Sequence, residues 1–599
     1  MSESQFCNPV KFKDGKRHTN PDPFVLRWCG KYYCYSTDVR GINLSVSSDL
    51  VNWEYLGLCI SENEYKDYWA PAVIYINGNF YMYYSNIRIG EVEGHNIWLK
   101  VAVADNPKGP FIWQKTFFDE FSIDAHPVIW NSQLYMFYSV NNIIGTDEKK
   151  AGTIIVMDKM LSPLEFAGER KVVLLPSIEQ EIFQKNRFND GRDWYTLEGA
   201  ATVVHGDKCF LTYSANAYLN VDYFVGYAVA KVKESLLDMT WKKSPSDYEW
   251  KPVLRKNDVV EGTGHNVIVK APNMVDDWIV YHGRRADEEL VVTKEQREMR
   301  IDRLFFSGDK MICFGPTQHD VEVPKKAWIQ VENIKIISQV FLGINEKCLK
   351  AEVWLSAKKQ HIGCRYDLYL AYIDERNYVK MELHSGKRNL CIYECIEGIE
   401  RLIDTINLLK DFIYSVPHLF AIYKTYQNYR ILIDDCIKVK FSVSECFNRG
   451  FRVGIKPYFT EVMLHSLSIV KTVKLEGNNL AFLREYYDVD KTFIGEEGIK
   501  SNEDIFILTD KVKNTDFAEE IIFHSEPKVS ELIVAYNEDK RISVKPGRGD
   551  FSIYRIRCGN VDKLIVDGEV YEDINVQSNF VYKLYLQHLS IKGYIYTES

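Results

Sequence analysis

Apolar and polar positions follow a repeated phrase through the first half of the chain. A short apolar run leads into a polar turn, and the turn leads into a second run rich in aromatic residues. Five copies are present, and their aromatic runs lie at 32–36, 80–85, 134–139, 209–214 and 278–282. A strand, a polar turn and a second strand are typical of a β-hairpin. The phrase therefore predicts five hairpins within residues 1–320.

The spacing of the five hairpins favours a radially repeated fold. It is close to the length of one propeller blade, so residues 1–320 are predicted to form a five-bladed β-propeller. A β-sandwich with unrelated hairpins is the alternative, but it does not explain why one phrase occurs five times.

Beyond residue 320 the phrase stops and other β-rich patterns begin. A linker at 315–328 precedes strand-like runs that predict a β-sandwich over residues 329–475. One segment within it, "IEGIERLIDTINLLKDF" (396–412), is predicted to be a helical insert. Residues 476–599 predict a small C-terminal β-rich module, so the whole chain is expected to be all-β.

Composition and charge narrow the classes of function. The chain has 599 residues, a net charge of -9 and 14% aromatic residues, which suit both strands and sugar-binding surfaces. It has no long basic run or basic amphipathic helix, which disfavours nucleic-acid and membrane partners. The first residues show no apolar signal segment, and the 13 cysteines are scattered without a Cys-x-x-Cys pair. Free thiols and a cytoplasmic location are therefore expected.

Carboxylates stand at the start of three repeated units. Asp22 lies between Pro21 and Pro23, whereas Asp124 and Glu198 precede the third and fourth apolar runs. Proline restricts its own backbone and that of the preceding residue, so the backbone that presents Asp22 is stiff. The innermost strands of a propeller line its channel, so three acids at their leading ends should share one pocket. For each acid alone, a turn or capping role is the alternative.

A pocket with several carboxyl groups suits glycoside hydrolysis. Neighbouring carboxyl groups shift one another's pKa values apart. One protonated carboxyl can then donate to the leaving oxygen while an ionised one activates water, and a third acid can adjust the pKa of the donor. A decayed propeller that only binds sugar is the non-enzymatic alternative, and it predicts the loss of at least one acid.

These motifs resemble those of glycoside hydrolase family 43 over residues about 8–320. The matching segments, in chain order, are "NPDPFVL", "YWAPAVIYINGNFYMYYS", "SIDAHPVIW", "LEGAATVV", "GTGHNVIV" and "REMRIDRLFF". The resemblance implies that Asp22 is the general base and Glu198 the general acid. It implies that Asp124 orients the acid and modulates its pKa. Glu181 and Asp193 are the alternatives to Glu198, but neither is followed by a strand-like run.

The resemblance also implies other residues of the pocket. Arg297 is expected to contact the substrate, with a surface arginine in a charged run as the alternative. Apart from the resemblance, Trp69 is expected either to stack on a sugar or to pack between blades. The candidates for the rim are Trp194, Tyr195, Asn216, Ala217 and Tyr218. His265 is placed at the channel centre, where it would contact substrate, water or a structural Ca²⁺. Calcium prefers oxygen ligands, so a structural role is an equal alternative, and no cofactor is required.

The implied activity is that of an inverting exo-glycosidase. It would release terminal α-L-arabinofuranosyl or β-D-xylosyl residues from short oligosaccharides, with base and acid roughly 6.5–9.5 Å apart. Asp124 would keep Glu198 protonated by like-charge repulsion. The sandwich is similar to the concanavalin-like modules of many members, and it is expected to wall one side of the pocket. An endo-arabinanase, a galactofuranosidase or a fructosidase is the alternative. Fructosidases use an Asn-Asp-Pro nucleophile, and Pro21 before Asp22 argues against that class.

Overall fold

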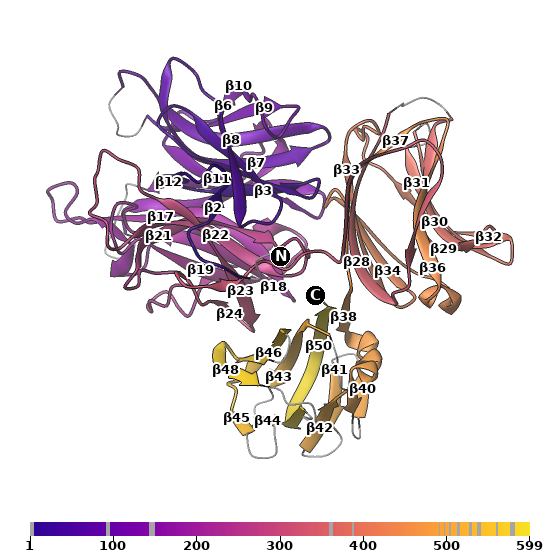
Figure 1. The fold of residues 1–599 in the computed structure, drawn as a ribbon. Helices are drawn as coiled ribbons and strands as arrows, with labels where there is room; N and C mark the ends of the chain where they lie inside the picture. Colours follow the sequence, from indigo (N-terminus) through magenta and orange to yellow (C-terminus); the bar gives the residue numbers. More distant parts are fainter. Residues whose placement is uncertain are drawn as a thin grey trace.

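The computed structural model is built from strands and a few short 3-10 helices (Figure 1). It describes residues 5–91, 96–142, 150–358, 363–385, 388–489, 492–495, 498–501, 505–511, 515–525, 530–535, 541–558, 561–575 and 582–598. Within these residues, no helix has the length and apolar character needed to cross a membrane. The all-β prediction is therefore confirmed.

All five predicted hairpins form antiparallel pairs. They are β3 (Phe24–Trp28) with β4 (Lys31–Thr37), β7 (Tyr65–Ile76) with β8 (Asn79–Arg88), β11 (Ser122–Trp130) with β12 (Gln133–Asn142), β17 (Trp194–His205) with β18 (Lys208–Ala215), and β21 (Val260–Lys270) with β22 (Asp277–Arg285). The blades continue outward through β5 (Ile42–Ser47), β6 (Asn52–Ile60), β9 (Trp98–Ala104), β10 (Ile112–Thr116), β13 (Gly152–Ser162), β15 (Lys171–Leu174), β19 (Phe224–Lys231), β20 (Lys242–Lys243), β23 (Glu298–Ser307) and β24 (Lys310–Cys313). Each innermost hairpin thus begins one of five blades.

The third and fourth blades are joined by a short parallel pairing. Gly152 and Thr153 of β13 pair with Tyr195 and Thr196 of β17. A side chain at Gly152 would lie 2.2 Å from the carbonyl oxygen of Tyr195, so the strands approach this closely only because the residue is glycine. This seam lies where the third and fourth blades meet.

An irregularity lies at the same position in four of the innermost strands and just before β3 in the first blade. One residue there has a positive φ, and strand pairing begins or resumes two residues later in all five blades. The five residues are Asp22, Ala70, Asp124, Gly199 and His265, with φ between 41° and 61°. Such bulges redirect side chains and are common beside active sites. Asp22 and Asp124 occupy this position, but in the fourth blade Gly199 holds it and Glu198 lies one residue earlier.

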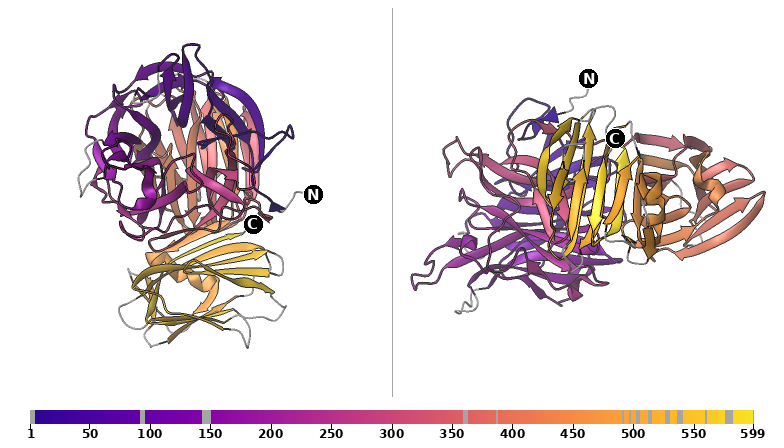
Figure 2. Two further views of the ribbon diagram at one scale, coloured as in Figure 1. Left: turned by 90° about the vertical axis from the view of Figure 1, so that its left-hand side faces the viewer. Right: turned by 90° about the horizontal axis from the view of Figure 1, so that it is seen from below.

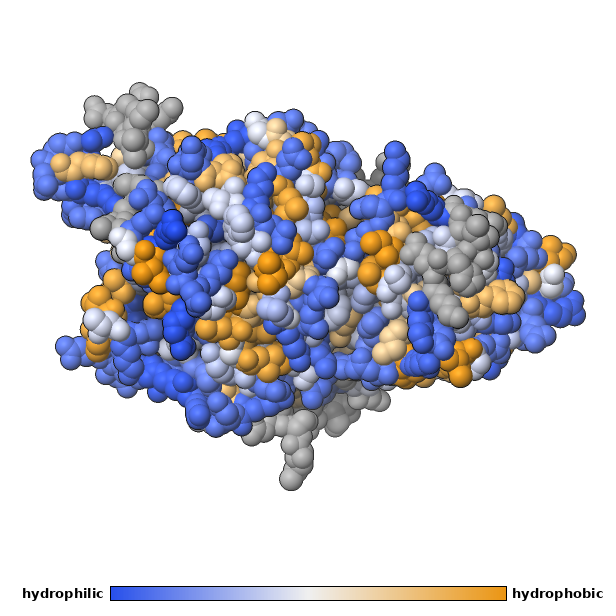
Figure 3. Space-filling view, turned by 90° about the horizontal axis from the view of Figure 1, so that it is seen from above, coloured by the Kyte–Doolittle hydropathy of each residue, from blue (hydrophilic) through white to orange (hydrophobic). Residues whose placement is uncertain are grey.

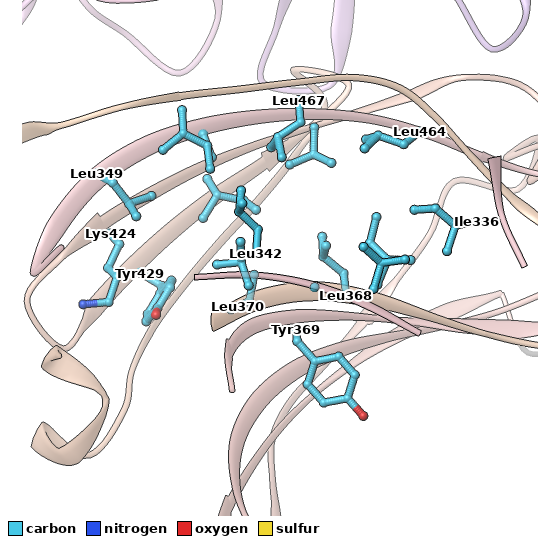
Figure 4. Close-up of a pocket in the computed structure, with 18 residues that line it drawn as sticks. Ile336, Leu342, Leu349, Leu368, Tyr369, Leu370, Lys424, Tyr429, Leu464 and Leu467 are labelled. Carbon is cyan, nitrogen blue, oxygen red and sulfur yellow. The ribbon is translucent and has the colours of Figure 1, made fainter. Parts of the chain in front are cut away.

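Two six-stranded antiparallel sheets follow the propeller and share one hydrophobic core. One contains β26 (Ile329–Ile336), β37 (Val462–Val470), β28 (Cys348–Ala357), β33 (His418–Thr425), β34 (Asn428–Ile433) and β35 (Ile437–Ser442). The other contains β27 (Val340–Ile344), β36 (Phe451–Tyr458), β29 (Arg365–Asp374), β30 (Asn377–His384), β31 (Asn389–Ile396) and β32 (Ile399–Asn407). Leucine side chains from both sheets point into an apolar gap of about 90 Å³ between them (Figure 4). This gap is part of the core.

The predicted helical insert at 396–412 is wrong. Residues 389–407 form the hairpin of β31 and β32, with Glu397 and Gly398 at positive φ in the turn. The register shifts between Ile392 and Tyr393, so β32 has an irregularity near Ile403. The irregularity disturbs the strict alternation of a strand and leaves apolar residues at a spacing that resembles a helix.

The C-terminal region contains two further sheets around their own core. The larger contains β38 (Thr472–Glu476), β40 (Thr492–Gly495), β41 (Gly498–Ser501), β43 (Phe517–Ser525), β46 (Gly549–Cys558), β47 (Val561–Val566), β48 (Glu569–Asn575) and β50 (Leu589–Glu598). The smaller contains β39 (Tyr487–Val489), β42 (Ile505–Asp510), β44 (Glu531–Ala535), β45 (Arg541–Val544) and β49 (Lys583–Gln587). Because β38 pairs with β50, this unit begins a few residues before the boundary at 476 expected from the sequence.

The two-sheet unit packs against one face of the propeller, and the C-terminal unit lies beside both (Figures 1 and 2). The contacts come from the turns that close the innermost hairpins. Tyr75 donates a hydrogen bond to the carbonyl of Pro417, and Arg27 forms an ion pair with Glu352. A side chain at Gly78 would lie 2.7 Å from Val416. The sandwich therefore covers the propeller face where the hairpins turn, which is opposite the face that carries the bulges.

The surface seen in Figure 3 shows hydrophobic side chains in patches separated by hydrophilic ones. This mixture is normal for a folded protein, since apolar atoms contribute a large share of any protein surface.

Candidate active site

A cavity of about 420 Å³ lies on the bulged face of the propeller. All six residues predicted for the site line it: Asp22, Trp69, Asp124, Glu198, His265 and Arg297. Of the rim candidates, Trp194 and Tyr218 line it, whereas Tyr195, Asn216 and Ala217 do not. Every lining residue that the structure describes belongs to the propeller, so among these residues the sandwich does not wall the pocket as expected. The sandwich is bound to the opposite face.

Asp22 is held as an ionised carboxylate. One oxygen lies 3.0 Å from Nη1 of Arg297, and the other accepts a hydrogen bond of 2.7 Å from the hydroxyl of Thr37. Burial alone would raise the pKa of Asp22, but the charge of Arg297 is the largest of several opposing effects that outweigh burial and hold the pKa well below its ordinary value. The backbone N–H of Asp22 donates to Nδ1 of His282, which fixes the backbone as well. An ionised, oriented carboxylate is suited to remove a proton from water.

Glu198 has the opposite electrostatic character. Burial raises its pKa to about 7, and the negative charge of Asp22 adds to the rise. Tyr223 donates a hydrogen bond of 2.7 Å to Oε1, which partly opposes it. A carboxyl with a pKa near 7 is protonated in a large fraction of molecules at neutral pH, as a proton donor must be.

Tyr223 reaches Glu198 because Gly264 leaves room for its ring. A side chain at Gly264 would lie 1.9 Å from a ring carbon of Tyr223. The same ring stacks on His282, with centroids 5.8 Å apart and planes inclined by 6°. Gly264, the second glycine of the "GTGH" segment, is therefore required by the packing of Tyr223 in the active site.

Asp124 lies beside Glu198 and also holds the backbone that follows it. Burial raises the pKa of Asp124 well above its ordinary value, and the charges of Glu198 and Asp22 raise it further. Because repulsion between two carboxylates is mutual, this proximity disfavours ionisation of both groups, which is the direction of the modulating role expected for Asp124. Asp124 also accepts a hydrogen bond of 3.1 Å from the backbone N–H of Gly199. It therefore positions the chain next to Glu198 as well.

His265 sits between two of the acids. Its Nδ1 lies 3.5 Å from Asp22 and 3.9 Å from Asp124, and its backbone N–H donates to Ser214. Burial lowers the pKa of His265, which favours the neutral ring. Within the described part of the chain, no group of three or more His, Cys, Asp or Glu residues is arranged to hold a metal ion. Calcium prefers oxygen ligands, so a calcium ion held by His265, directly or through water, stays a prediction.

Arg297 is anchored on several sides. Glu295 accepts hydrogen bonds from its Nε and Nη2 at 2.9 and 2.8 Å, and the guanidinium lies 4.9 Å from the ring centre of Tyr218. It is therefore a fixed part of the pocket, and the alternative of a surface arginine is wrong. Trp69 packs against the cluster of Ile97 and its neighbours, as the blade-packing alternative expects. It also lines the cavity, where stacking on a sugar stays a prediction.

The alternatives to Glu198 lie elsewhere. Glu181 is fully buried and forms an ion pair of 2.6 Å with Lys243. Asp193 accepts a hydrogen bond from the backbone N–H of Asn186 in an exposed turn. Neither lines the cavity, so Glu198 is the acid that the fold brings to Asp22.

Four contributing residues were not found from the sequence: Thr37, Tyr223, His282 and Glu295. Thr37 directly follows the aromatic run of the first hairpin and His282 ends that of the fifth, so their position in the repeat was an available signal. Tyr223 and Glu295 lie in connections between strands, where no local pattern indicates their role.

Comparison with known proteins decides the family. Residues 8–312, just over half of the chain, match the model for glycosyl hydrolases family 43. The chain belongs to this family. The family 43 assignment covers the propeller and every residue that lines the cavity.

Several family 43 relatives and structures are similar to the chain. An extracellular exo-alpha-(1->5)-L-arabinofuranosidase of Streptomyces avermitilis is 25% identical over 328 residues, covering 52% of this chain and 63% of the relative. The alpha-L-arabinofuranosidase 43 of Humicola insolens is 25% identical over 273 residues, covering 43% and 51%. The crystal structure of a thermostable family-43 glycoside hydrolase is 32% identical, covers 54% of this chain and 99% of its own, and has a TM-score of 0.45. The chain thus spans less than two thirds of the length of these two arabinofuranosidases.

Proposed function

We propose that the protein is an inverting exo-glycoside hydrolase that releases terminal α-L-arabinofuranosyl residues, β-D-xylosyl residues, or both, from short oligosaccharides. Asp22 is the general base and Glu198 the general acid. The observation that carries the proposal is the contrast between them: Asp22 is held ionised by Arg297, while the pKa of Glu198 is raised to about 7 in the same cavity. Two carboxyl groups with separated pKa values are the requirement of this reaction.

In the proposed mechanism, Asp22 removes a proton from a water molecule that attacks the anomeric carbon. Glu198 donates its proton to the glycosidic oxygen as the bond to the leaving sugar breaks. Arg297 and Thr37 keep Asp22 ionised and fix its orientation, and Asp124 holds the backbone beside Glu198. The configuration at the anomeric carbon inverts because water attacks the face opposite the leaving group.

The choice of sugar rests on the relatives. Two arabinofuranosidases that resemble this chain support an arabinofuranosyl substrate, and a xylan 1,3-beta-xylosidase of a Vibrio species, 30% identical over 108 residues, supports a xylosyl one. All 13 cysteines are free thiols, which supports a reducing location such as the cytoplasm.

Hydrolysis of aryl glycosides, followed by NMR, tests the proposal. The panel is the p-nitrophenyl derivatives of α-L-arabinofuranose, β-D-xylopyranose and β-D-galactofuranose. We expect turnover of one or both pentosides, with the inverted anomer as the first product seen by proton NMR. Turnover of the galactofuranoside alone would overturn the choice of sugar, and a first product with retained configuration would overturn the mechanism.

A further inference from the structure

The cavity extends beyond the three acids along β17. Trp194, Thr196 and Glu198 alternate along this strand and all line the cavity. Successive side chains on one strand face are about 7 Å apart, so Trp194 is about 13 Å from Glu198 along the strand. Thr196 is paired with Thr153, which also lines the cavity, so the seam between the third and fourth blades underlies this extension.

An arginine and two aromatic rings form its outer wall. The guanidinium of Arg187 lies 4.8 Å from the ring centre of Trp194 and 5.7 Å from that of Phe183. All three side chains line the cavity. Among the residues that the structure describes, no carboxylate lies within ion-pair distance of Arg187. Its five N–H donors are therefore not committed to a counter-ion.

From this arrangement, and resting on the function proposed above, we infer that Arg187, Trp194 and Phe183 form the subsite for the leaving sugar. Glu198 protonates the leaving oxygen, so the departing sugar lies on the Glu198 side of the scissile bond. That side continues along β17 toward Trp194. A sugar ring presents an apolar face and a rim of hydroxyl groups. The aromatic rings can pack against the apolar face, and the planar guanidinium can donate hydrogen bonds to the hydroxyl groups.

The inference separates two kinds of substrate. A glycosyl fluoride places only one atom beyond the scissile bond, so it does not use this subsite. A disaccharide places a whole sugar there. Arg187→Met keeps the length and apolar packing of the side chain between the two rings but removes its donors. It should lower kcat/KM for the disaccharide at least tenfold and leave kcat/KM for the fluoride within twofold of the wild type.

The same loop supplies a matched control. Arg192 also lies over an aromatic ring, that of Phe188 at 4.7 Å, but it pairs with Asp190 and does not line the cavity. Arg192→Met should leave kcat/KM for both substrates within twofold of the wild type. An equal loss for both substrates in Arg187→Met, or no loss for either, would overturn the inference.

Failure of the proposed function would look different from failure of the subsite. If the wild type hydrolysed neither compound, the proposed function would be wrong whatever the variants did. The subsite would then be tested by titration calorimetry with the disaccharide and with its terminal monosaccharide. The subsite assignment stands if the wild type binds the disaccharide more tightly than the monosaccharide and Arg187→Met removes that difference. The assignment fails if the variant binds both sugars as the wild type does.

Discussion

The carboxylate of Asp124 accepts a hydrogen bond of 3.1 Å from the backbone N–H of Gly199, the residue that follows Glu198. Gly199 has a φ of 61°, and a side chain there would lie 3.3 Å from the ring of His265. The irregular strand that presents the general acid is thus fixed on one side by Asp124 and on the other by His265. The position of the proton donor is set through the backbone.

This relationship predicts different effects for two substitutions of Asp124. Asn keeps an oxygen that accepts from Gly199, whereas Ala removes it. Burial and the neighbouring carboxyl groups raise the pKa of Asp124 and so favour its neutral form, which Asn resembles. We expect Asp124→Asn to keep kcat/KM within about tenfold and Asp124→Ala to lose about 10²-fold or more, as expected for a misplaced catalytic group. If charge repulsion were the role of Asp124, Asn would instead shift the alkaline limb of the pH profile downward.

Tyr223→Phe should move the alkaline limb of kcat/KM to higher pH. The hydroxyl of Tyr223 donates to Glu198 and stabilises its ionised form, so its removal raises the pKa of Glu198 above about 7. The active form is the protonated one, and it would persist to higher pH. A pH–rate profile of both proteins measures the shift. An alkaline limb that stays in place or moves downward would show that another group controls it.

The ion pair between Arg27 and Glu352 should contribute strongly to docking of the sandwich. Both side chains are largely buried, at 16% and 10% exposed. Glu352→Gln leaves Arg27 buried without a carboxylate, and breaking such pairs costs about 3–5 kcal/mol. We expect a clear loss of unfolding free energy in a denaturant titration.

An exposed pair at the same interface serves as the control. Lys31 and Glu332 are 3.5 Å apart, with side chains 42% and 27% exposed. Exposed pairs contribute about 0–1 kcal/mol, so Glu332→Gln should change the free energy of unfolding little. Equal losses of unfolding free energy in Glu352→Gln and Glu332→Gln would contradict the stronger contribution assigned to the buried pair.

The pH dependence of this contribution follows from the direction of the shift. Arg27 and Lys350 outweigh burial and lower the pKa of Glu352 below its value in the unfolded chain, which is about 4.3. The stabilisation is therefore complete above that value and is lost as the pH falls through the folded pKa. The difference between wild type and Glu352→Gln should shrink on acidification below about pH 4.

The propeller and the three acids could be predicted because the repeat fixes both. Side chains at the leading end of each innermost strand must converge at one mouth of the channel, so the positions of Asp22 and Asp124 in the repeat were sufficient to bring them together. Glu198 lies one residue before the shared position, and no pattern in the chain indicates that offset. It follows from Gly199 taking the left-handed conformation in its place.

What could not be predicted depends on contacts distant in sequence. The ring of Tyr223 reaches Glu198 only because Gly264, 41 positions later, lacks a side chain, and no local pattern reports such a fit. The face on which the sandwich packs is decided by complementary turns such as Gly78 against Val416. The hairpin near Ile403 was mistaken for a helix because a bulge disturbs the alternation that identifies a strand.

The division of roles between Asp22 and Glu198 is tested most directly by varying the leaving group. A glycosyl fluoride needs no proton from the enzyme to depart, whereas a disaccharide does. We predict that Glu198→Gln lowers kcat/KM for the disaccharide by about 10²–10⁴ but spares the fluoride to within about tenfold, and that Asp22→Asn lowers both by about 10²–10⁴, because every substrate needs the water activated. The reverse pattern, or equal losses for both substrates in both variants, would contradict the assignment of Glu198 as acid and Asp22 as base.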